Sequence, residues 1–201
     1  MERIMIINAS PRAPKSNSKQ YANLFPKYCH LPTQYYEVKQ SNHLSLCHMI
    51  KNFSDILFVF PLYADGLPVT LLNFLKTLEA NMPQNKPTIS VIINCGFIEP
   101  EQNDIAIEML RLYCETNGLP FGSVLKIGSG EAILSTPFRL LLNRKMKKLA
   151  NSIATQQHCR LQVTMPISKK MFIHASTIYW KNYGKKNGIT QEDMRSMKIE
   201  A

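Results

Sequence analysis

The sequence predicts an α/β fold: a parallel sheet with helices on both of its faces. Short apolar runs such as residues 56–60 are rich in Ile, Val and Phe, as expected for strands that are buried on both sides. These runs alternate with segments in which apolar residues recur at helical spacing, and strand–helix–strand alternation builds parallel sheets. Five strands connected in this way predict the strand order 2-1-3-4-5.

The predicted strands are short and are separated by loops that contain proline, glycine or polar residues. They comprise residues 4–7, 34–38, 56–60, 88–93 and 121–127. The predicted helices lie around residues 21–25, at 43–53, from Pro68 to Leu78, at 104–117 and from Thr136 towards residue 157. The last of these is long and basic. We find neither an internal repeat nor a low-complexity segment.

The helix predicted at residues 104–117 has signals at both ends. Asp104 is expected to cap its first turn, and Asn117-Gly118 to end it. The side chains expected to face inward are Ile105, Met109, Leu112 and Tyr113. These would pack against the sheet.

Length and composition favour a single domain with a tail. The 201-residue chain is 45% hydrophobic, which is enough for one substantial core. We expect a domain at residues 1–160 and a basic, aromatic extension at residues 161–201. No apolar run is long enough to span a bilayer, and the first residues do not resemble a signal peptide. Five scattered cysteines without a Cys-x-x-Cys favour reduced thiols in the cytoplasm, and argue against a zinc ribbon or an iron–sulfur cluster.

The net charge of +10 lies entirely in the C-terminal part of the chain. Residues 1–138 contain 11 basic and 11 acidic side chains, whereas residues 139–201 contain 13 and 3. Basic residues interleaved with aromatic ones can bind an anionic membrane surface, nucleic acid or the phosphates of NADPH. We favour an arm that packs on its own domain or on a second subunit, because aromatic side chains need burial. Specific nucleic-acid binding is disfavoured, since no recognition motif accompanies the charge.

The predicted strand order defines where a ligand would bind. In open α/β sheets, ligands lie beyond the carboxyl ends of the strands, where the strand order reverses. Here that edge gathers three loops, at residues 8–19, 61–68 and 94–100. The first is dense in hydroxyls, amides and positive charge and leads into a helix. Free N–H groups and the dipole at a helix N-terminus make such a turn an anion site, and we expect a phosphate there.

The form of these loops resembles one family. Residues 8–19 contain neither a Gly-x-Gly-x-x-Gly nor a Walker sequence. They are similar to the phosphate loop of the flavodoxin-like NAD(P)H-dependent FMN reductases and quinone reductases, which often reads G-S-P-R-x-x-G-N-T/S. The residues that match are Ser10, Pro11, Arg12, Asn17 and Ser18, with Ala9 and Ser16 where the family commonly has glycine. The Pro-Leu-Tyr at residues 61–63, followed by Leu-Pro and a helix, is also common in this family.

The resemblance implies a flavodoxin-like three-layer sandwich that binds FMN. The residues that it places at the phosphate are Ser10, Arg12, Ser16, Asn17 and Ser18. Those that it places along the isoalloxazine are Pro61, Leu62, Tyr63 and Ala64. Those that it places at the pyrimidine side of the ring are Asn94, Cys95, Gly96 and Phe97. An aromatic side chain and main-chain amides suit a flat ring on which charge develops.

The implied activity is that of a cytoplasmic, homodimeric, FMN-dependent oxidoreductase. Hydride would pass from NAD(P)H through FMN to a quinone, a flavin or another small acceptor. The resemblance assigns no catalytic side chain; Tyr63 is expected to shape the acceptor pocket. Two alternatives stay open: a flavodoxin-type electron carrier, and a flavin-free binding module of the same fold.

Other motifs are weaker. His43 and Cys47 lie four apart on a predicted helix, but no further metal ligand accompanies them, so we expect no metal site. A Ser–His–Asp triad is disfavoured because the chain has no Gly-x-Ser-x-Gly. Residues 128–131 resemble a glycine-rich phosphate loop, yet they follow the last predicted strand. We interpret them as a turn that could reach a flavin edge or a nicotinamide.

Overall fold

The structure, a computed structural model, describes residues 3–12 and 15–196. It divides the chain into two compact units, Met1–Met165 and Pro166–Ala201, which are described separately below. The sequence placed this division after residue 160. The first unit extends further because a strand that the sequence did not predict lies at residues 160–163.

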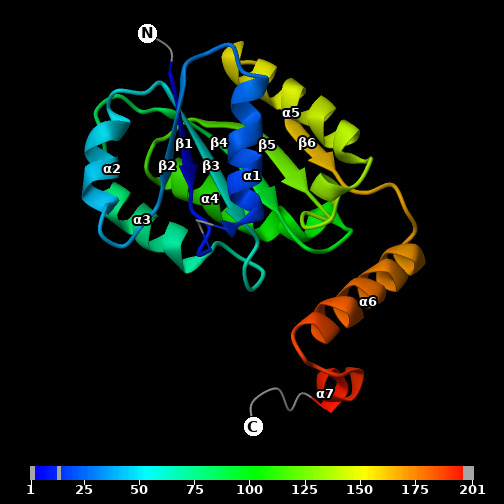
Figure 1. Cartoon of the computed structure of the whole chain (residues 1–201). Helices are drawn as coiled ribbons and strands as arrows, with labels where there is room; N and C mark the ends of the chain where they lie inside the picture. The colour runs from blue at the N-terminus through cyan, green and yellow to red at the C-terminus, as the bar shows by residue number, and fades with distance from the viewer. Residues whose placement is uncertain (1–2, 13–14, 197–201) are drawn as a thin grey trace. The chain divides into compact units, whose positions relative to one another are not determined.

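The first unit is built on a parallel sheet of six strands in the order β2-β1-β3-β4-β5-β6 (Figure 1). The strands are β1 (Ile4–Asn8), β2 (Thr33–Glu37), β3 (Asp55–Pro61), β4 (Thr88–Asn94), β5 (Phe121–Ile127) and β6 (Arg160–Val163). The predicted parallel α/β sheet and the order of its first five strands are confirmed. The predicted number of five strands is wrong, because β6 pairs in parallel with β5 at the sheet edge. This edge strand has four residues and half of them are exposed, so it lacks an apolar run.

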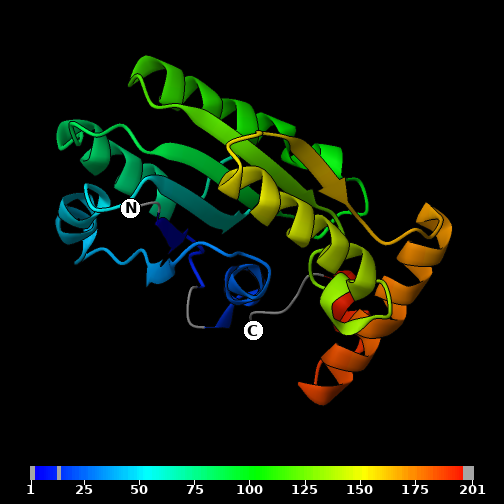
Figure 2. The same ribbon diagram turned by 90° about the horizontal axis from the view of Figure 1, so that it is seen from above.

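Five helices cover the two faces of this sheet. They are α1 (Asn17–Leu24), α2 (His43–Ile50), α3 (Val69–Ala80), α4 (Asp104–Thr116) and α5 (Arg139–Ala154). Short 3₁₀ turns, η2 (Phe25–Lys27), η3 (Pro100–Asn103) and η4 (Ile133–Ser135), precede or follow some of them. Seen from above, α1 and α5 lie on one face of the sheet and α2, α3 and α4 on the other, as Figure 2 shows. The three layers are those that the sequence predicted.

The core forms because the central strands are apolar towards both faces. Alternate residues of a strand point to opposite sides, so Leu57 and Phe58 of β3 pack into different layers, and both are fully buried. Burying one such side chain contributes about 2 kcal/mol. The layer that contains α2, α3 and α4 holds one large cluster, in which Phe58 packs edge-on to Phe74 at 6.1 Å between ring centroids.

The predicted inward face of α4 is wrong for three of its four residues. Tyr113 does pack, partly buried, against the core, and its hydroxyl donates to Leu75 O at 2.9 Å. Ile105, Met109 and Leu112 are exposed, at 64%, 38% and 52%. The residues of α4 that are buried are Ala106, Ile107, Leu110 and Cys114. Asp104 also does not cap the helix: it is the first helical residue, and its carboxylate accepts a hydrogen bond from Lys126 Nζ at 2.7 Å. The helix thus leaves an apolar stripe on the surface.

The second unit consists of α6 (Lys169–Lys186) and α7 (Gln191–Ser196). Ser168 caps α6, since its Oγ accepts from Met171 N at 3.3 Å. Thr190 and Asp193 bond to each other's N–H groups at the start of α7, an arrangement known as a capping box. These helices form the basic helical extension that the sequence predicted. Within residues 3–12 and 15–196, we find no helix both long and apolar enough to cross a membrane.

The corrected face of α4 makes a stability prediction. Leu110 is fully buried whereas Leu112 is exposed. Leu110→Ala should lower the free energy of unfolding by about 3 kcal/mol, because it leaves a cavity against the sheet. Leu112→Ala should change it by less than about 0.5 kcal/mol. Urea unfolding of the two variants measures both values, and a larger loss in Leu112→Ala than in Leu110→Ala would mean that the helix packs by the face the sequence predicted.

Candidate functional site

The candidate site lies at the carboxyl edge of the sheet, where the loops that follow β1, β3, β4 and β5 come together. All strands run in the same direction, so these loops share one edge (Figure 1). They occupy residues 9–16, 62–68, 95–99 and 128–132. The strand order reverses between β1 and β3, and this is where open α/β sheets bind ligands.

The first loop leaves β1 as a rigid extension of the strand. Asn8 Oδ1 accepts from Ser10 N at 3.1 Å, and Ala9 N donates to Val59 O at 3.0 Å. From the start of α3, Thr70 Oγ1 donates to Ala9 O at 2.7 Å. Residues 8–10 are therefore held from three sides before the loop turns outward.

The middle of this loop separates a buried hydroxyl from exposed charges. Ser10 is buried, and its Oγ accepts from Arg12 N at 3.3 Å, so this hydroxyl shapes the turn. Arg12 O in turn accepts from Lys15 N at 3.0 Å. The side chains of Arg12 and Lys15 are exposed and supply positive charge at the rim. Loop residues 13 and 14 lie outside the described part of the chain.

The N-terminus of α1 is the strongest anion-binding feature of the edge. Ser16 is the N-cap, and its Oγ accepts from Lys19 N at 3.2 Å. Among the described residues, none accepts a hydrogen bond from the backbone N–H of Asn17 or of Ser18. These amides and the positive end of the helix dipole are suited to an anion. The Asn17 side chain accepts from Gln20 Nε2 at 3.0 Å, so it lies along the helix.

Asn94, at the end of β4, ties this helix to the sheet. Its Nδ2 donates to Ser18 Oγ at 3.0 Å and to Phe60 O at 3.1 Å. The main-chain carbonyl oxygen of Asn94 accepts a hydrogen bond from Leu62 N at 2.8 Å. The side chains of Asn94 and Ser18 are buried, so their visible role is to hold α1, β3 and β4 together.

A second buried bond joins α1 to the loop after β5. The Tyr21 hydroxyl donates to Gly130 O at 2.6 Å, and burial raises the pKa of Tyr21 well above its usual value. Gly130 N donates to Cys95 O at 2.8 Å. A Cβ on Gly130 would lie 3.0 Å from both Asn94 Cβ and Cys95 O, so any other residue here would have to push these neighbours away by a few tenths of an ångström.

The turn at residues 128–130 thus belongs to the edge, although it was not among the predicted site residues. Ser129 is buried with φ at 51°, and its N donates to Phe97 O at 2.5 Å. Its Oγ lies 3.0 Å from Thr164 Oγ1, which donates to Ile98 O. The turn supports the loop after β4. The Gly-Ser-Gly sequence was the signal that could have identified it.

The loop after β3 is a two-residue hairpin that presents Tyr63. Tyr63 and Gly66 exchange backbone hydrogen bonds of 3.2 and 3.1 Å. Ala64 and Asp65 between them both have positive φ, 46° and 57°, the conformation of a type I′ turn. Such values cost an alanine about 1 kcal/mol. Tyr63 is 61% exposed, Leu62 is half-buried, and Pro61 pairs with Asn94 at the strand end.

The loop after β4 contains one buried thiol and one open surface. Cys95 Sγ accepts from Asn103 Nδ2 at 3.4 Å, and burial raises the pKa of this thiol, so it stays protonated at neutral pH. A Cβ added to Gly96 would meet no atom within 4 Å. Phe97 is half exposed. The open face at Gly96 and Phe97 is available to a ligand, whereas the Cys95 side chain is turned into the protein.

The two ends of this edge differ in charge and in the kind of side chain that they expose. One end has two exposed cations and the Asn17 and Ser18 amides, which donate to no described residue; the other has exposed Tyr63 and Phe97. Such an arrangement can hold a molecule with an anionic group and a flat ring. All five cysteines are free thiols, and among the described residues no three His, Cys, Asp or Glu side chains gather as a metal site.

Comparison with known proteins agrees with this fold. No family model and no curated protein matches the chain. Among solved structures, it is similar to an NAD(P)H:quinone oxidoreductase from Methanothermobacter marburgensis, with TM-score 0.60 and 11% identity over 75% of this chain and 95% of that one. It is also similar to an FMN-dependent NADH-azoreductase from Bacillus anthracis in complex with FMN, with TM-score 0.56 and 15% identity over 77% and 100%. A flavodoxin from Streptococcus pneumoniae TIGR4 matches with TM-score 0.54 and 12% identity over 75% and 99%. The chain therefore has the flavodoxin-like fold.

An ion pair beside the site predicts a pH dependence. Lys19 Nζ bonds Glu37 Oε1 at 3.0 Å, joining α1 to β2, and this bond holds the pKa of Glu37 below its ordinary value. A lowered pKa stabilises the fold above the unfolded-state pKa of about 4.3, and this stability is lost as pH falls through the folded-state value. At pH 6, the free energy of unfolding of the wild type should exceed that of Glu37→Gln by about 0.5 kcal/mol. This difference should disappear near pH 3. Urea unfolding against pH measures this, and a Lys19→Met variant that kept the wild-type pH dependence would contradict it.

Proposed function

We propose that this protein is an FMN-dependent oxidoreductase that takes hydride from NAD(P)H and delivers it to a small acceptor such as a quinone, a flavin, or a nitro or azo compound. One observation carries the proposal. At the switch point of a flavodoxin-like sheet, the α1 N-terminus shares an edge with exposed Tyr63 and Phe97, and no described residue accepts a hydrogen bond from its Asn17 and Ser18 amides. The names of similar structures, which include azoreductases and quinone reductases, support the same class of reaction.

The residues present fit FMN in three respects. The amides of Asn17 and Ser18, with Arg12 at the rim, suit the phosphate. The open space at the Cβ position of Gly96, with no described atom within 4 Å outside its chain neighbours, leaves room for a ring against the backbone. The exposed Tyr63 side chain, held on a tight hairpin, offers an aromatic surface.

In this proposal the redox chemistry is that of FMN, which accepts and releases hydride. The chain binds its phosphate, positions the ring between two loops, and leaves space above it for nicotinamide and acceptor in turn. The two buried titratable side chains at this edge are not suited to acid–base catalysis: the Cys95 thiol is buried and stays protonated, and the Tyr21 hydroxyl is buried and donates to Gly130 O. Tyr63 is proposed to shape the acceptor pocket.

The first experiment separates phosphate recognition from ring recognition. The apoprotein is titrated with FMN and with riboflavin, followed by flavin fluorescence. Arg12→Glu should weaken FMN binding about tenfold, or about 1.4 kcal/mol, and leave riboflavin binding unchanged. Lys51→Glu, an exposed charge at the opposite edge of the sheet just before β3, is the matched control and should change neither.

Gly96→Ala tests the ring side of the same site. The added methyl group meets no protein atom, so the free energy of unfolding should change by less than about 0.5 kcal/mol. Both FMN and riboflavin should bind more weakly. Unaltered titrations in this variant and in Arg12→Glu would contradict the proposed site.

The flavin experiments also distinguish the two alternative functions. Bound flavin should bleach rapidly when NADPH is added without air. A protein that binds FMN but does not bleach would be an electron carrier, and one that takes up no FMN would be a flavin-free binding module. The positive charge of this chain disfavours a carrier, because flavodoxin-type carriers usually present an acidic docking face.

We also propose that the protein is a homodimer that covers the exposed stripe of α4. Ile105, Met109 and Leu112 share one face of the helix, and Met109 Sδ lies within 3.4 Å of the position of a Cβ on Gly66, beside the Tyr63 hairpin. A contact there would complete the acceptor side of the site. Ile105→Glu combined with Leu112→Glu should give a monomer by light scattering while Leu110 keeps the fold intact; a monomeric wild type would exclude the dimer.

A further inference from the structure

The turn between α6 and α7 fixes how these two helices follow each other. Ile189 N donates to Gly184 O at 2.9 Å, and Gly188 between them has φ at 71°. Together with the bond from Gly188 N to Lys185 O, this is a Schellman motif, which ends a helix and sets the direction of the chain beyond it. The capping box described above then begins α7. The connection between the two helices is therefore defined by hydrogen bonds at both ends.

Gly184 is the point at which α7 packs against α6. It is the one buried residue among those described in α6. A Cβ at this position would overlap Met194 Cε and would lie 3.2 Å from Ile189 O. The glycine thus leaves the space that the Met194 side chain of α7 occupies. Met194 is also part of the wall of a hollow between the two helices.

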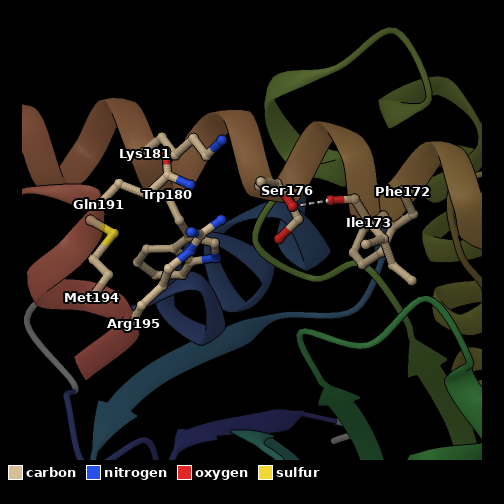
Figure 3. Close-up of a pocket in the computed structure, with 9 residues that line it drawn as sticks. Phe172, Ile173, Ser176, Trp180, Lys181, Gln191, Met194 and Arg195 are labelled. Carbon is tan, nitrogen blue, oxygen red and sulfur yellow. Dashed lines mark hydrogen bonds between the residues drawn. The ribbon is translucent and has the colours of Figure 1, made fainter. Parts of the chain in front are cut away.

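This hollow has a volume of about 470 Å³. Its apolar wall is formed by Phe172, Ile173, Trp180 and Met194. Figure 3 shows these side chains together with polar groups of the same hollow, among them Ser176 and Arg195. The volume lies in the range of about 300–1,000 Å³ that is usual for small-molecule sites.

The described wall of the hollow carries positive charge and no negative charge. Arg195 and Lys181 belong to the wall, whereas Glu192 and Asp193, the acidic residues described in this unit, do not. Neither cation forms an ion pair with a described residue. In Figure 3, Arg195 extends from α7 alongside Trp180. A guanidinium in this position can bind a carboxylate through two parallel hydrogen bonds.

Two tyrosines support Trp180 from outside the hollow. Tyr179 and Tyr183 meet the Trp180 ring edge to face, at 5.2 and 5.8 Å between ring centroids, and neither lines the hollow. Helical spacing places Lys170 and Lys185 on the side of α6 opposite these tyrosines, and they do not line the hollow either. The candidate site therefore uses only the face of α6 that α7 meets.

We propose that the hollow between α6 and α7 binds a small organic anion with a flat apolar body, such as an aromatic carboxylate. The ring lies against Trp180, Phe172 and Met194. The carboxylate faces Arg195, with Lys181 at the rim. This site is separate from the proposed flavin site, because every residue of its wall belongs to the second unit.

Trp180 makes this inference directly measurable, because it is the single tryptophan of the chain and lines the hollow. Full-length protein is titrated with biphenylcarboxylate and with the uncharged biphenylcarboxamide, followed by tryptophan emission and by calorimetry. The carboxylate should change the emission and saturate the protein below about 1 mM. The amide has nearly the same shape but no charge, so it should bind about tenfold more weakly.

Variants separate the charge from the apolar wall. Arg195→Gln should weaken carboxylate binding about tenfold and leave amide binding unchanged, because it removes only the guanidinium. Phe172→Ala should weaken the binding of both ligands to the same extent, by roughly fivefold. The matched control is Lys185→Gln, which removes an exposed cation of the same helix outside the hollow. It should bind both ligands as the wild type does, and far-UV circular dichroism checks that each variant keeps its helices.

Four results would overturn the proposal. The first is a tryptophan emission that the carboxylate leaves unchanged up to about 1 mM. The second is an amide that binds as tightly as the carboxylate, and the third is an equal loss of binding in Lys185→Gln and Arg195→Gln. The fourth is an emission that changes with protein concentration in the absence of ligand, which would make a second copy the occupant.

A competition experiment distinguishes this site from the proposed flavin site. Excess FMN should not displace biphenylcarboxylate, and displacement would place the carboxylate at the sheet edge and contradict the proposal. A protein that takes up no FMN would refute the flavin function and leave the carboxylate titrations unaffected.

Discussion

The functional edge of this protein depends on buried hydrogen bonds around the end of β4. The Asn94 amide joins Ser18 of α1 to the Phe60 carbonyl of β3, and the Tyr21 hydroxyl joins the same helix to Gly130. Removing one partner would leave a buried polar group unsatisfied, which costs more than the bond itself contributes. These bonds therefore hold α1, β3, β4 and the turn after β5 in one arrangement. A ligand at this edge meets a surface that is already in place.

The groups of the first loop fall into two kinds, those bonded within the protein and those exposed at the edge. The family resemblance assigns the hydroxyls of Ser10 and Ser18 to a ligand, yet both side chains are buried and hydrogen-bonded within the protein. The groups left for an anion are main-chain amides and the exposed Arg12 and Lys15. The side chains of the motif thus shape the loop, and the backbone that they position is what faces the ligand.

Two exposed apolar surfaces of the chain differ in their electrostatic character. The stripe on α4 runs beside Asp104, Glu108 and Glu115, and Arg111 there is bonded to two of these carboxylates. The helix α6 carries five lysines and no acidic residue.

The amino-acid sequence by itself determined the alternation of strands and helices, and the strand order that places three loops at one edge. The runs in β3 and β4 are mostly apolar because both faces of these strands are covered, and such runs can be recognised without tertiary information. Tertiary structure decided the rest. Edge strand β6 has one covered side and too few residues for a recognisable pattern. The helix α4 has apolar residues on two sides, and only the position of the sheet decides that Leu110 is buried and Leu112 exposed. The same holds at the site: Ser18 is placed in a buried bond by Asn94, a residue far away in the sequence, and local chemistry carries no information about such a partner.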